Sequence, residues 1–200
     1  MSQSDLPVFL HVGCGPQRQQ RTPFADKPWR ELRLDIDASV LPDFVGSMTD
    51  MSSVVDSSVD SVFSSHNIEH LYPHEVPIAL AEFRRVLTPG GFVLITCPDL
   101  RSVCRLVADD KLTDAAYQSG MGPITPLDIL YGHRASMQEG NLFMAHRSGF
   151  TAKVLAATLR EAGFSSAVKC RPQHFDLWAV GTLDSNEQSL LNLVTEFFPA

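Results

Sequence analysis

The most informative part of this sequence is the apolar run Val8-Phe9-Leu10-His11-Val12-Gly13-Cys14-Gly15, which ends in two glycines. Such a run predicts a strand buried in a parallel sheet. Because glycine lacks a Cβ, the two glycines let the backbone approach a bound ligand closely at the carboxyl end of that strand. The residues that follow, Pro16-Gln17-Arg18, supply neither the third glycine nor the clean helix start that a dinucleotide pyrophosphate requires. The run therefore predicts a ligand-binding strand end, and it argues against an NAD-dependent oxidoreductase.

Further along the chain, short apolar runs alternate with helical patterns, which is typical of a parallel sheet with crossover helices. The predicted strands after 8–12 are 32–34, 44–45, 61–64, 92–97, 167–170 and 176–182, and the predicted helices are 76–87, 99–107 and 151–162. We expect Asp99 and Thr151 to cap the second and third of these helices, and Gly163 to end the third. Several prolines lie between the first two strands, so the first crossover is expected to be short or irregular.

The composition limits the class of protein. The 200 residues, of which 44% are hydrophobic and 20% charged, fit one globular domain spanning 1–200. A formal net charge of −7 argues against nucleic acid or an anionic membrane surface as a partner. No apolar run is long enough to span a bilayer, and the first residues lack the basic character of a secretory signal. The four cysteines show no C-x-x-C spacing, which indicates reduced thiols and predicts a cytoplasmic protein.

Asp35 is the first candidate for ligand binding. It stands at the end of the second predicted strand, about twenty residues after the two glycines. A carboxylate only accepts hydrogen bonds, so it can bridge both hydroxyls of a ribose. Asp37, by contrast, is predicted to stabilise a turn or to cap a helix. The spacing therefore predicts a ribose-binding carboxylate at Asp35.

Four segments in order carry a more specific signal than any of them alone. They are His11-Val12-Gly13-Cys14-Gly15, Arg33-Leu34-Asp35-Ile36-Asp37, Ser64-Ser65-His66-Asn67-Ile68-Glu69-His70-Leu71 and Phe83-Arg84-Arg85-Val86-Leu87-Thr88-Pro89-Gly90-Gly91. Together they resemble the class I S-adenosylmethionine-dependent methyltransferases, most of all their small bacterial type 11-like branch. The resemblance covers 8–182 and implies an α/β, Rossmann-like fold with flanking helices. It implies a seven-stranded, mostly parallel sheet in the order 3-2-1-4-5-7-6, with the last strand antiparallel, and S-adenosyl-L-methionine as cofactor.

The resemblance also implies where the cofactor lies. Gly13, Cys14 and Gly15 would pass under its methionine part, and Asp35 would bind the ribose hydroxyls. The adenine would be bordered by Ser47 and Met48, and the amino-acid moiety and methyl group by Ser64, Ser65 and His66. Many relatives have an aspartate for the adenine amino group where this chain has Ser47, so Asp50 is the candidate that would replace it.

The segment His66-Asn67-Ile68-Glu69-His70 also matches H-x-x-E-H, a zinc-peptidase signature. Zinc chemistry of that kind requires both histidines on one helical face, with the glutamate as base. Here the motif straddles the end of a strand, and no third ligand stands out in the sequence. We therefore predict no metal site. For His70 the sequence allows two roles, packing at the sheet edge or a contact in the site. His74 is expected to be solvated.

Methyl transfer from a sulfonium is an in-line displacement, in which the protein mainly positions the acceptor. His66 is a candidate catalytic residue, because a neutral imidazole can take a proton from a hydroxyl or amine acceptor. The segment 112–150 has no clean period and is too long for an ordinary connection, so it is predicted to form a lid or acceptor-binding insertion. Its candidates are His146 for catalysis and Tyr131, His133 and Arg147 for the substrate.

The segment 185–198 predicts a C-terminal amphipathic helix. Ser185 and Gln188 match a capping box, and the apolar residues Leu190, Leu193, Val194 and Phe197 share one face. Such a helix can cover the core of its own domain or form a homodimer, and the sequence leaves both open.

The predicted function is a methyltransferase that acts on a small or medium-sized polar acceptor, a small molecule, with neither nucleic acid nor membrane as partner. The alternative is a non-catalytic regulatory module that binds S-adenosylmethionine or S-adenosylhomocysteine. Turnover on an acceptor separates the two.

Overall fold

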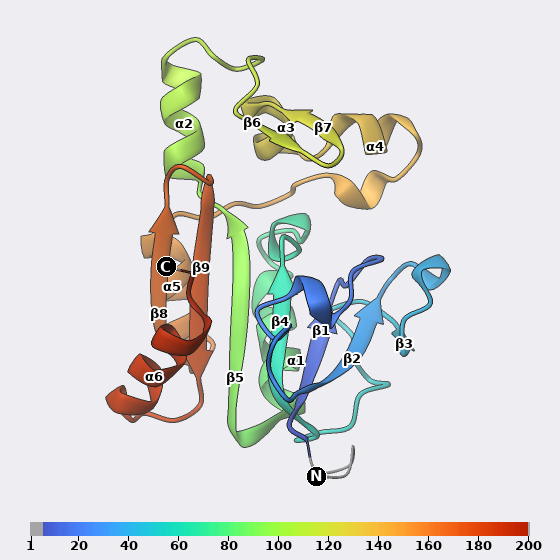
Figure 1. Ribbon diagram of the computed structural model, residues 1–200, viewed down its shortest axis with the longest axis vertical. Helices are drawn as coiled ribbons and strands as arrows, with labels where there is room; N and C mark the ends of the chain where they lie inside the picture. The colour runs from blue at the N-terminus through green and yellow to red at the C-terminus, as the bar shows by residue number, and fades with distance from the viewer. Residues whose placement is uncertain (1–5, 200) are drawn as a thin grey trace.

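A seven-stranded sheet forms the centre of the protein in the computed structural model, which describes residues 6–199 (Figure 1). The strands are β1 (Val8–Val12), β2 (Arg30–Asp35), β3 (Phe44–Val45), β4 (Val59–Ser65), β5 (Leu87–Pro98), β8 (Ser165–Arg171) and β9 (Asp176–Thr182). Their order is β3-β2-β1-β4-β5-β9-β8, and β9 runs antiparallel to both of its neighbours. Numbered within the sheet alone, this is 3-2-1-4-5-7-6, so the predicted fold class is confirmed.

β1 lies in the middle of the sheet and is buried along its whole length. It pairs in parallel with β2 on one side and β4 on the other. Leu10 and Val12 point into the hydrophobic core on one face, whereas Phe9 belongs to the core on the opposite face. Because both faces are covered, this strand is almost continuously apolar, as the sequence predicted.

Two helices cover one face of the sheet, α1 (Val76–Val86) and α5 (Ala152–Glu161), which lie behind it in Figure 1. Leu80 and Phe83 of α1 and Leu155 and Leu159 of α5 are fully buried in the same core as Leu10. The helical spacing of these residues is what the sequence predicted for both helices.

Three of the predicted helix ends are confirmed. The Asp99 carboxylate accepts hydrogen bonds from the first amides of α2 (Leu100–Ala108), and the Thr151 hydroxyl caps α5. Gly163 follows α5 with φ +88°, a left-handed conformation that favours glycine. Its amide and that of Phe164 donate to the carbonyls of Arg160 and Leu159, which closes the helix.

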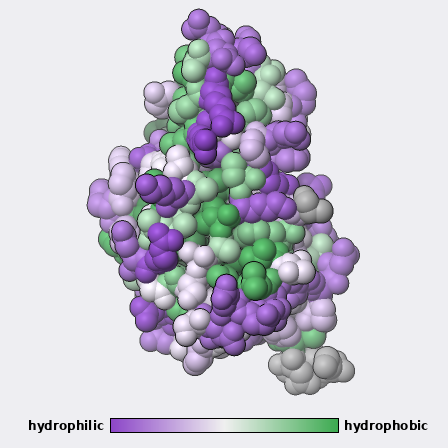
Figure 2. Space-filling view, turned by 90° about the vertical axis from the view of Figure 1, so that its left-hand side faces the viewer, coloured by the Kyte–Doolittle hydropathy of each residue, from purple (hydrophilic) through white to green (hydrophobic). Residues whose placement is uncertain are grey.

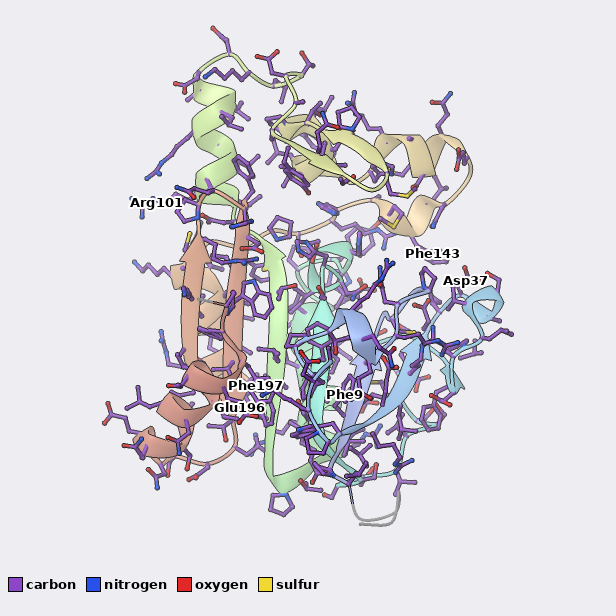
Figure 3. The ribbon with its side chains drawn as sticks, in the orientation of Figure 1. Phe9, Asp37, Arg101, Phe143, Glu196 and Phe197 are labelled. Carbon is purple, nitrogen blue, oxygen red and sulfur yellow. The ribbon has the colours of Figure 1, made fainter. Side chains whose placement is uncertain are left out.

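Within residues 6–199, no crossover α-helix covers the other face of the sheet. Between β1 and β2 the chain forms only the 3₁₀ helix Gln19–Arg21, which confirms the predicted irregular crossover. The fully buried Phe24 of this segment and Phe197 of α6 (Glu187–Phe197) cover the face together, with ring centroids 5.0 Å apart. Figure 3 labels Phe197 and Phe9, which belong to this aromatic core. The C-terminal helix therefore covers the core of its own domain, while the predicted homodimer stays a prediction.

The predicted capping box at the start of α6 is wrong. The cap is Asn186, not Ser185, and its side-chain oxygen accepts a hydrogen bond from the amide of Gln188. Asparagine and serine are equally good caps, so two adjacent candidates preceded the helix and the spacing to Gln188 favoured the wrong one.

The segment 112–150 folds into small elements above the carboxyl edge of the sheet (Figure 1). They are β6 (Tyr117–Ser119), β7 (Gly122–Ile124), α3 (Pro126–Tyr131), α4 (Arg134–Gln138) and the 3₁₀ helix Leu142–Met144. Ile124 and Ile129 pack with Val103 of α2 in a small core separate from the two cores of the sheet. The segment is thus a structured insertion, and its role as a lid stays a prediction.

The surface carries scattered apolar groups. Figure 2 shows the side that carries α2, β8 and α6, where hydrophobic residues gather in the middle with hydrophilic ones around them. Val154 and Leu191 are among the exposed apolar side chains of α5 and α6. Within residues 6–199, no helix combines the length and hydropathy that crossing a membrane requires. Residues 1–5, to which the prediction about a secretory signal refers, lie outside the described part.

Candidate functional site

A cleft of about 940 Å³ opens at the carboxyl ends of β1, β2 and β4. This is the edge at which open α/β sheets bind their ligands. One wall is formed by the loops that follow these strands, and the other by residues that include His70, Phe143, Met144 and Arg147. Figure 3 labels one residue from each wall, Asp37 and Phe143. The insertion and the sheet thus share one cavity.

Gly13 makes room for a side chain that ties two strands together. It has φ +60°, and a Cβ at this position would lie 2.2 Å from Oδ1 of Asn67. The Asn67 amide donates hydrogen bonds to the carbonyls of Val12 (3.0 Å) and Ser65 (2.9 Å). These bonds join the end of β1 to the end of β4, so the floor of the cleft is fixed by the protein itself.

Asp35 is held with its carboxylate against the glycine loop. Its Oδ2 accepts a hydrogen bond from the Gly15 amide at 2.7 Å, and its Oδ1 accepts one from the Asp37 amide at 2.9 Å. The buried Arg33 guanidinium donates to the carbonyls of Gly15 and Leu41, which fixes the same loop from below. Each carboxylate oxygen keeps a second lone pair, so Asp35 can also accept from a ligand in the cleft.

Cys14 lies between the two glycines and lines the cleft. Burial raises the pKa of its thiol to about 11, although the neighbouring Arg33 opposes the shift. The thiol is therefore protonated at neutral pH, and Cys14 contributes shape rather than a nucleophile.

The loop after β3 forms the side of the cleft where the resemblance put an adenine. Ser47 and Met48 line the cleft, and the Ser47 hydroxyl is bonded to that of Thr49 at 2.8 Å. Asp50 is exposed, does not line the cleft, and accepts a hydrogen bond from the Ser52 amide instead. The structure therefore does not bring Asp50 to the position that would replace the missing aspartate.

His66 follows β4 with φ +53°, an uncommon conformation for a residue with a Cβ. Its side chain lines the cleft and is half exposed, with Nδ1 3.5 Å from Oε1 of Glu69. Burial lowers the pKa of His66, but the Glu69 carboxylate outweighs it, so the pKa is raised above its ordinary value. Of the two preceding serines, Ser65 lines the cleft, whereas Ser64 is fully buried and does not.

Glu69 is the buried carboxylate of this region. It is 1% exposed, and neither of its oxygens has a hydrogen-bond partner among residues 6–199. Burial raises the pKa of Glu69, yet the imidazole of His66 brings it below its ordinary value, while burial lowers the pKa of His146. One donor atom each of Glu69, His70 and His146 lie within 4.8 Å of one another, so these three residues can hold a metal ion.

The substrate candidates of the insertion are placed differently from one another. Arg147 lines the cleft, with Nη1 donating to the His70 carbonyl at 2.8 Å. Tyr131 is 63% exposed and His133 caps α4, and neither lines the cleft. His146, the catalytic candidate, does not line the cleft; its side chain is mostly buried, and its Nδ1 is hydrogen-bonded to the Ile129 carbonyl at 2.8 Å.

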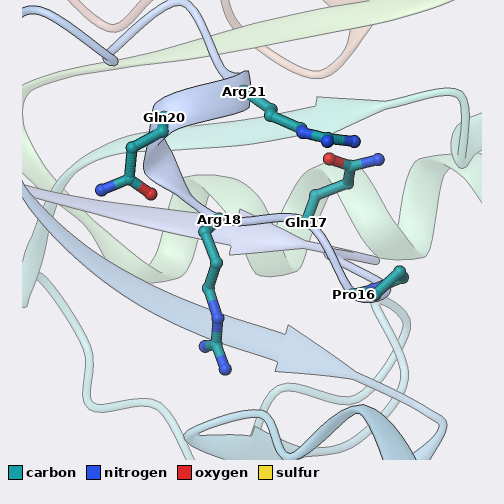
Figure 4. Close-up of a pocket in the computed structure, with 5 residues that line it drawn as sticks. All are labelled: Pro16, Gln17, Arg18, Gln20 and Arg21. Atoms are coloured by element: carbon teal, nitrogen blue, oxygen red, sulfur yellow. The ribbon is translucent and has the colours of Figure 1, made fainter.

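A second, smaller pocket of about 410 Å³ lies beside the cleft in the first crossover (Figure 4). Its lining residues are Pro16, Gln17, Arg18, Gln20 and Arg21. Pro16 and Gln17 also line the large cleft, so the two cavities share an edge, while the exposed side chains of Arg18 and Arg21 line the smaller pocket alone.

Sequence reasoning missed three cleft residues and one contact outside the cleft lining. Asn67 was part of a quoted motif, but its bonds to two carbonyls follow only from the register of β1 and β4. Phe143 and Met144 belong to a segment without a periodic pattern, so nothing in the sequence distinguished them. The partnership of Glu69 with His146 joins residues that only the insertion brings together.

Comparisons with known proteins agree with this geometry. A family model described as a methyltransferase domain matches residues 10–95, which include most of β1, all of β2, β3 and β4, and most of β5. A search of curated protein sequences found no significant match.

Solved structures share the fold at low sequence identity. A 1,6-didemethyltoxoflavin-N1-methyltransferase of Burkholderia thailandensis, with bound 1,6-didemethyltoxoflavin and S-adenosylhomocysteine, is 18% identical (TM-score 0.55; 90% of this chain, 73% of that one). S-adenosylmethionine-dependent methyltransferases of Archaeoglobus fulgidus (14%, TM-score 0.57, 89% and 86%) and Methanosarcina mazei (19%, TM-score 0.55, 89% and 92%) are also similar. Residues 10–95 thus match a methyltransferase domain, and the chain shares its fold with S-adenosylmethionine-dependent methyltransferases.

Proposed function

We propose that this enzyme transfers the methyl group of S-adenosylmethionine, by in-line displacement, to a small or medium-sized polar acceptor bound beside His66 and Arg147. The observation that carries the proposal is the position of Asp35. Its carboxylate lies against the Gly15 amide at the edge of a cleft whose far wall belongs to the insertion. One cavity therefore offers a place for the cofactor and a place for the acceptor.

The residues of the cleft fit the cofactor. A Cβ on Gly15 would meet nothing within 4 Å, so open space lies directly above the glycine loop. Asp35 offers acceptor oxygens for ribose hydroxyls, while Met48 and Ser47 offer an apolar and a polar contact for the base. When bound, the cofactor supplies an electrophilic methyl group on a sulfonium.

Arg147 is proposed to orient the acceptor. Its guanidinium lies 5.0 Å from the centre of the Tyr72 ring, and one of its N–H groups donates to the His70 carbonyl. The remaining N–H groups can donate to a polar or negatively charged group of the acceptor. This favours acceptors with a carboxylate, a phosphate or a carbonyl near the methylated atom.

His66 is proposed to contact the reacting atom. The half-exposed ring at the end of β4 lies in the cleft, while Glu69 faces its Nδ1. In an in-line displacement the protein aligns the acceptor with the bond that breaks, and an imidazole can accept the proton of an attacking hydroxyl or amine. The proposal gives His146 no role in this step, because it does not line the cleft.

The insertion 112–150 is proposed to act as a lid. Its end is anchored, since the amides of Arg147 and Ser148 both donate to the Glu69 carbonyl, at 2.8 and 3.1 Å. The preceding residues Phe143 and Met144 line the cleft from this anchor and can shield the reaction from water. The small core around Ile129 and the anchored end at Arg147 are the fixed parts. The segment between them is the part that would move as a lid.

The test of the proposed function has two stages. Isothermal titration with S-adenosylhomocysteine is expected to give one site of micromolar affinity, and a folded protein without binding would overturn the proposal. A screen of polar acceptors with labelled methyl donor then tests turnover. Binding without transfer to any acceptor would favour the alternative, a regulatory module.

We also propose that the protein is cytoplasmic and that it forms a homodimer through α6. The location is supported by the four cysteines, all of which are free thiols. The dimer is supported only by exposed apolar groups such as Leu191 on the outer side of α6. The mass of the protein in solution decides it, and a monomer would reject the dimer.

A further inference from the structure

We propose that Glu69, His70 and His146 form a binding site for a divalent transition metal ion of the zinc class. The three residues come from two segments of the chain. Glu69 and His70 belong to the 3₁₀ helix Ile68–His70 that follows β4, and His146 lies at the end of the insertion. One donor atom of each lies within 4.8 Å of those of the other two.

The first argument is the state of the Glu69 carboxylate. The side chain is 1% exposed, and neither oxygen has a hydrogen-bond partner among the described residues. The nearest imidazole nitrogens, His66 Nδ1 and His146 Nε2, stand 3.5 and 4.0 Å from Oε1. Buried carboxylates without partners are costly, and they are commonly compensated by a metal ion or a close ion pair. A cation between Glu69 and the two histidines would give the Glu69 carboxylate the partner that it lacks.

The second argument is the orientation of the two imidazoles. His70 Nδ1 lies 3.1 Å from the Ala145 carbonyl, and His146 Nδ1 lies 2.8 Å from the Ile129 carbonyl. A carbonyl can only accept, so both rings carry their proton on Nδ1 and leave the lone pair on Nε2. Metal-ligating histidines are held in this way, with the second ring nitrogen bonded to a backbone carbonyl.

The third argument is rigidity. The Glu69 carbonyl accepts hydrogen bonds from the amides of Arg147 and Ser148. The chain on either side is held by two more backbone hydrogen bonds, from the His146 amide to the Tyr131 carbonyl and from the Leu100 amide to the Phe150 carbonyl. The segments that carry the three side chains are thus held together by the backbone. In a tetrahedral zinc site, donor atoms lie roughly 3.3 Å apart. The observed 4.0 Å between Glu69 Oε1 and His146 Nε2 is about 0.7 Å longer, so ion binding requires these two atoms to approach by that amount.

Two imidazole nitrogens and one carboxylate oxygen are the donor set of zinc sites that keep a coordination position for water or substrate. Imidazole donors disfavour the hard ions Mg²⁺ and Ca²⁺, which prefer oxygen. His70 lines the cleft, so an ion held here lies at the wall of the acceptor side. The proposal concerns metal binding alone, and it stands or falls independently of the proposed methyl transfer.

The test uses untagged, chelator-treated protein. Titration with Zn²⁺ is expected to show one site of micromolar affinity or better, and Co²⁺ is expected to give visible absorption without a thiolate charge-transfer band. Mg²⁺ is expected not to compete. His70→Ala and His146→Ala are each expected to weaken Zn²⁺ binding at least tenfold. His174→Ala, which removes an exposed histidine outside the cluster, should leave the affinity unchanged.

Three results would overturn the site. They are no Zn²⁺ binding by the folded protein, variants that bind as tightly as wild type, or a thiolate band that points to cysteine ligands. Should either variant fail to fold, X-ray absorption at the zinc edge of the wild-type protein replaces it. Two imidazole ligands support the proposal, and none or one refutes it.

Discussion

The Gly15 amide donates a 2.7 Å hydrogen bond to Oδ2 of Asp35, a residue twenty positions further along the chain. This bond joins the ends of two neighbouring strands, β1 and β2, and it fixes the carboxylate without any ligand. Because the Asp37 amide binds the second oxygen, the carboxylate cannot rotate freely. A ligand that uses its remaining lone pairs meets a group that is already oriented, which lowers the entropic cost of binding.

Asp35→Ala is expected to weaken S-adenosylhomocysteine binding more than tenfold, which is at least about 1.4 kcal/mol. The variant loses the charged acceptor for the ribose and also the anchor of the glycine loop. Isothermal titration measures the effect. Asp50→Ala is the matched control, since Asp50 is exposed outside the cleft, and its affinity should stay within about twofold of wild type. Equal losses of affinity in both variants would indicate that the cofactor also contacts Asp50.

Gly13→Ala is expected to lower the free energy of unfolding by about 1–2 kcal/mol from the left-handed conformation alone. The contact of the new Cβ with Asn67 adds to this loss, because it displaces the amide that joins β1 to β4. Urea unfolding gives the value. Gly90→Ala serves for comparison, since a Cβ there meets nothing within 4 Å. A Gly13 variant as stable as the Gly90 variant would show that the hydrogen bonds of the Asn67 side chain to β1 and β4 do not contribute to stability.

His66→Ala is expected to lower kcat on a hydroxyl or amine acceptor roughly 100-fold or more, while the affinity for S-adenosylhomocysteine changes little. The reason is that the ring faces the cleft but makes no hydrogen bond that holds the glycine loop. Steady-state kinetics with labelled methyl donor, together with titration, separate the two effects. His174→Ala is the control, and full activity of the His66 variant would make this histidine structural.

Phe197→Ala is expected to reduce the free energy of unfolding by about 3–5 kcal/mol. The ring is 4% exposed, and its centroid lies 5.0 Å from those of Phe24 and Phe92, so its removal leaves a cavity in the second core. Leu191→Ala changes an exposed residue of the same helix and should cost about 0.5 kcal/mol or less. Similar losses for both variants would show that α6 does not close this core.

Asp128 is expected to make the insertion sensitive to acid. Burial alone would raise its pKa, but hydrogen bonds from Arg134 and Thr125 hold the pKa well below its ordinary range. A pKa lower in the folded than in the unfolded state gives stability that is present above about pH 4. That stability is lost as the pH falls through the folded value.

The measurement is the melting temperature of wild type and of Asp128→Asn at a series of pH values. The wild type is expected to be more stable near pH 7, and its advantage should shrink below about pH 4. Asp26→Asn, a change at an exposed residue, provides the comparison. An advantage that stays constant down to about pH 2 would contradict the proposed pairing.

The fold could be predicted from the sequence because its information is local. The apolar run of β1, the helical spacing of Leu80 and Phe83, and the cap at Asp99 each need only neighbouring residues. The start of α6 could not be settled in this way, because Ser185 and Asn186 are equivalent caps and only packing of the helix selects one.

The candidate site was predictable only where strand ends define it. Gly15, Asp35 and His66 follow strands, and parallel strands bring such residues to one edge. The insertion was not predictable, because its short elements have no period. No periodic pattern in the segment distinguishes Arg147, which lines the cleft, from Tyr131, which does not. For the same reason the sequence did not indicate that His146 approaches Glu69, 77 positions away.

The aromatic core has a consequence for the order in which the chain can fold. Phe9, Phe24 and Phe92 have all been synthesised once the chain reaches residue 92, but the ring that packs against them in the folded protein belongs to Phe197. A ribosome that adds roughly 5–20 residues per second leaves this face of the sheet open for several seconds. During that time the nascent chain displays a patch of phenylalanine rings, which is the kind of surface that chaperones recognise.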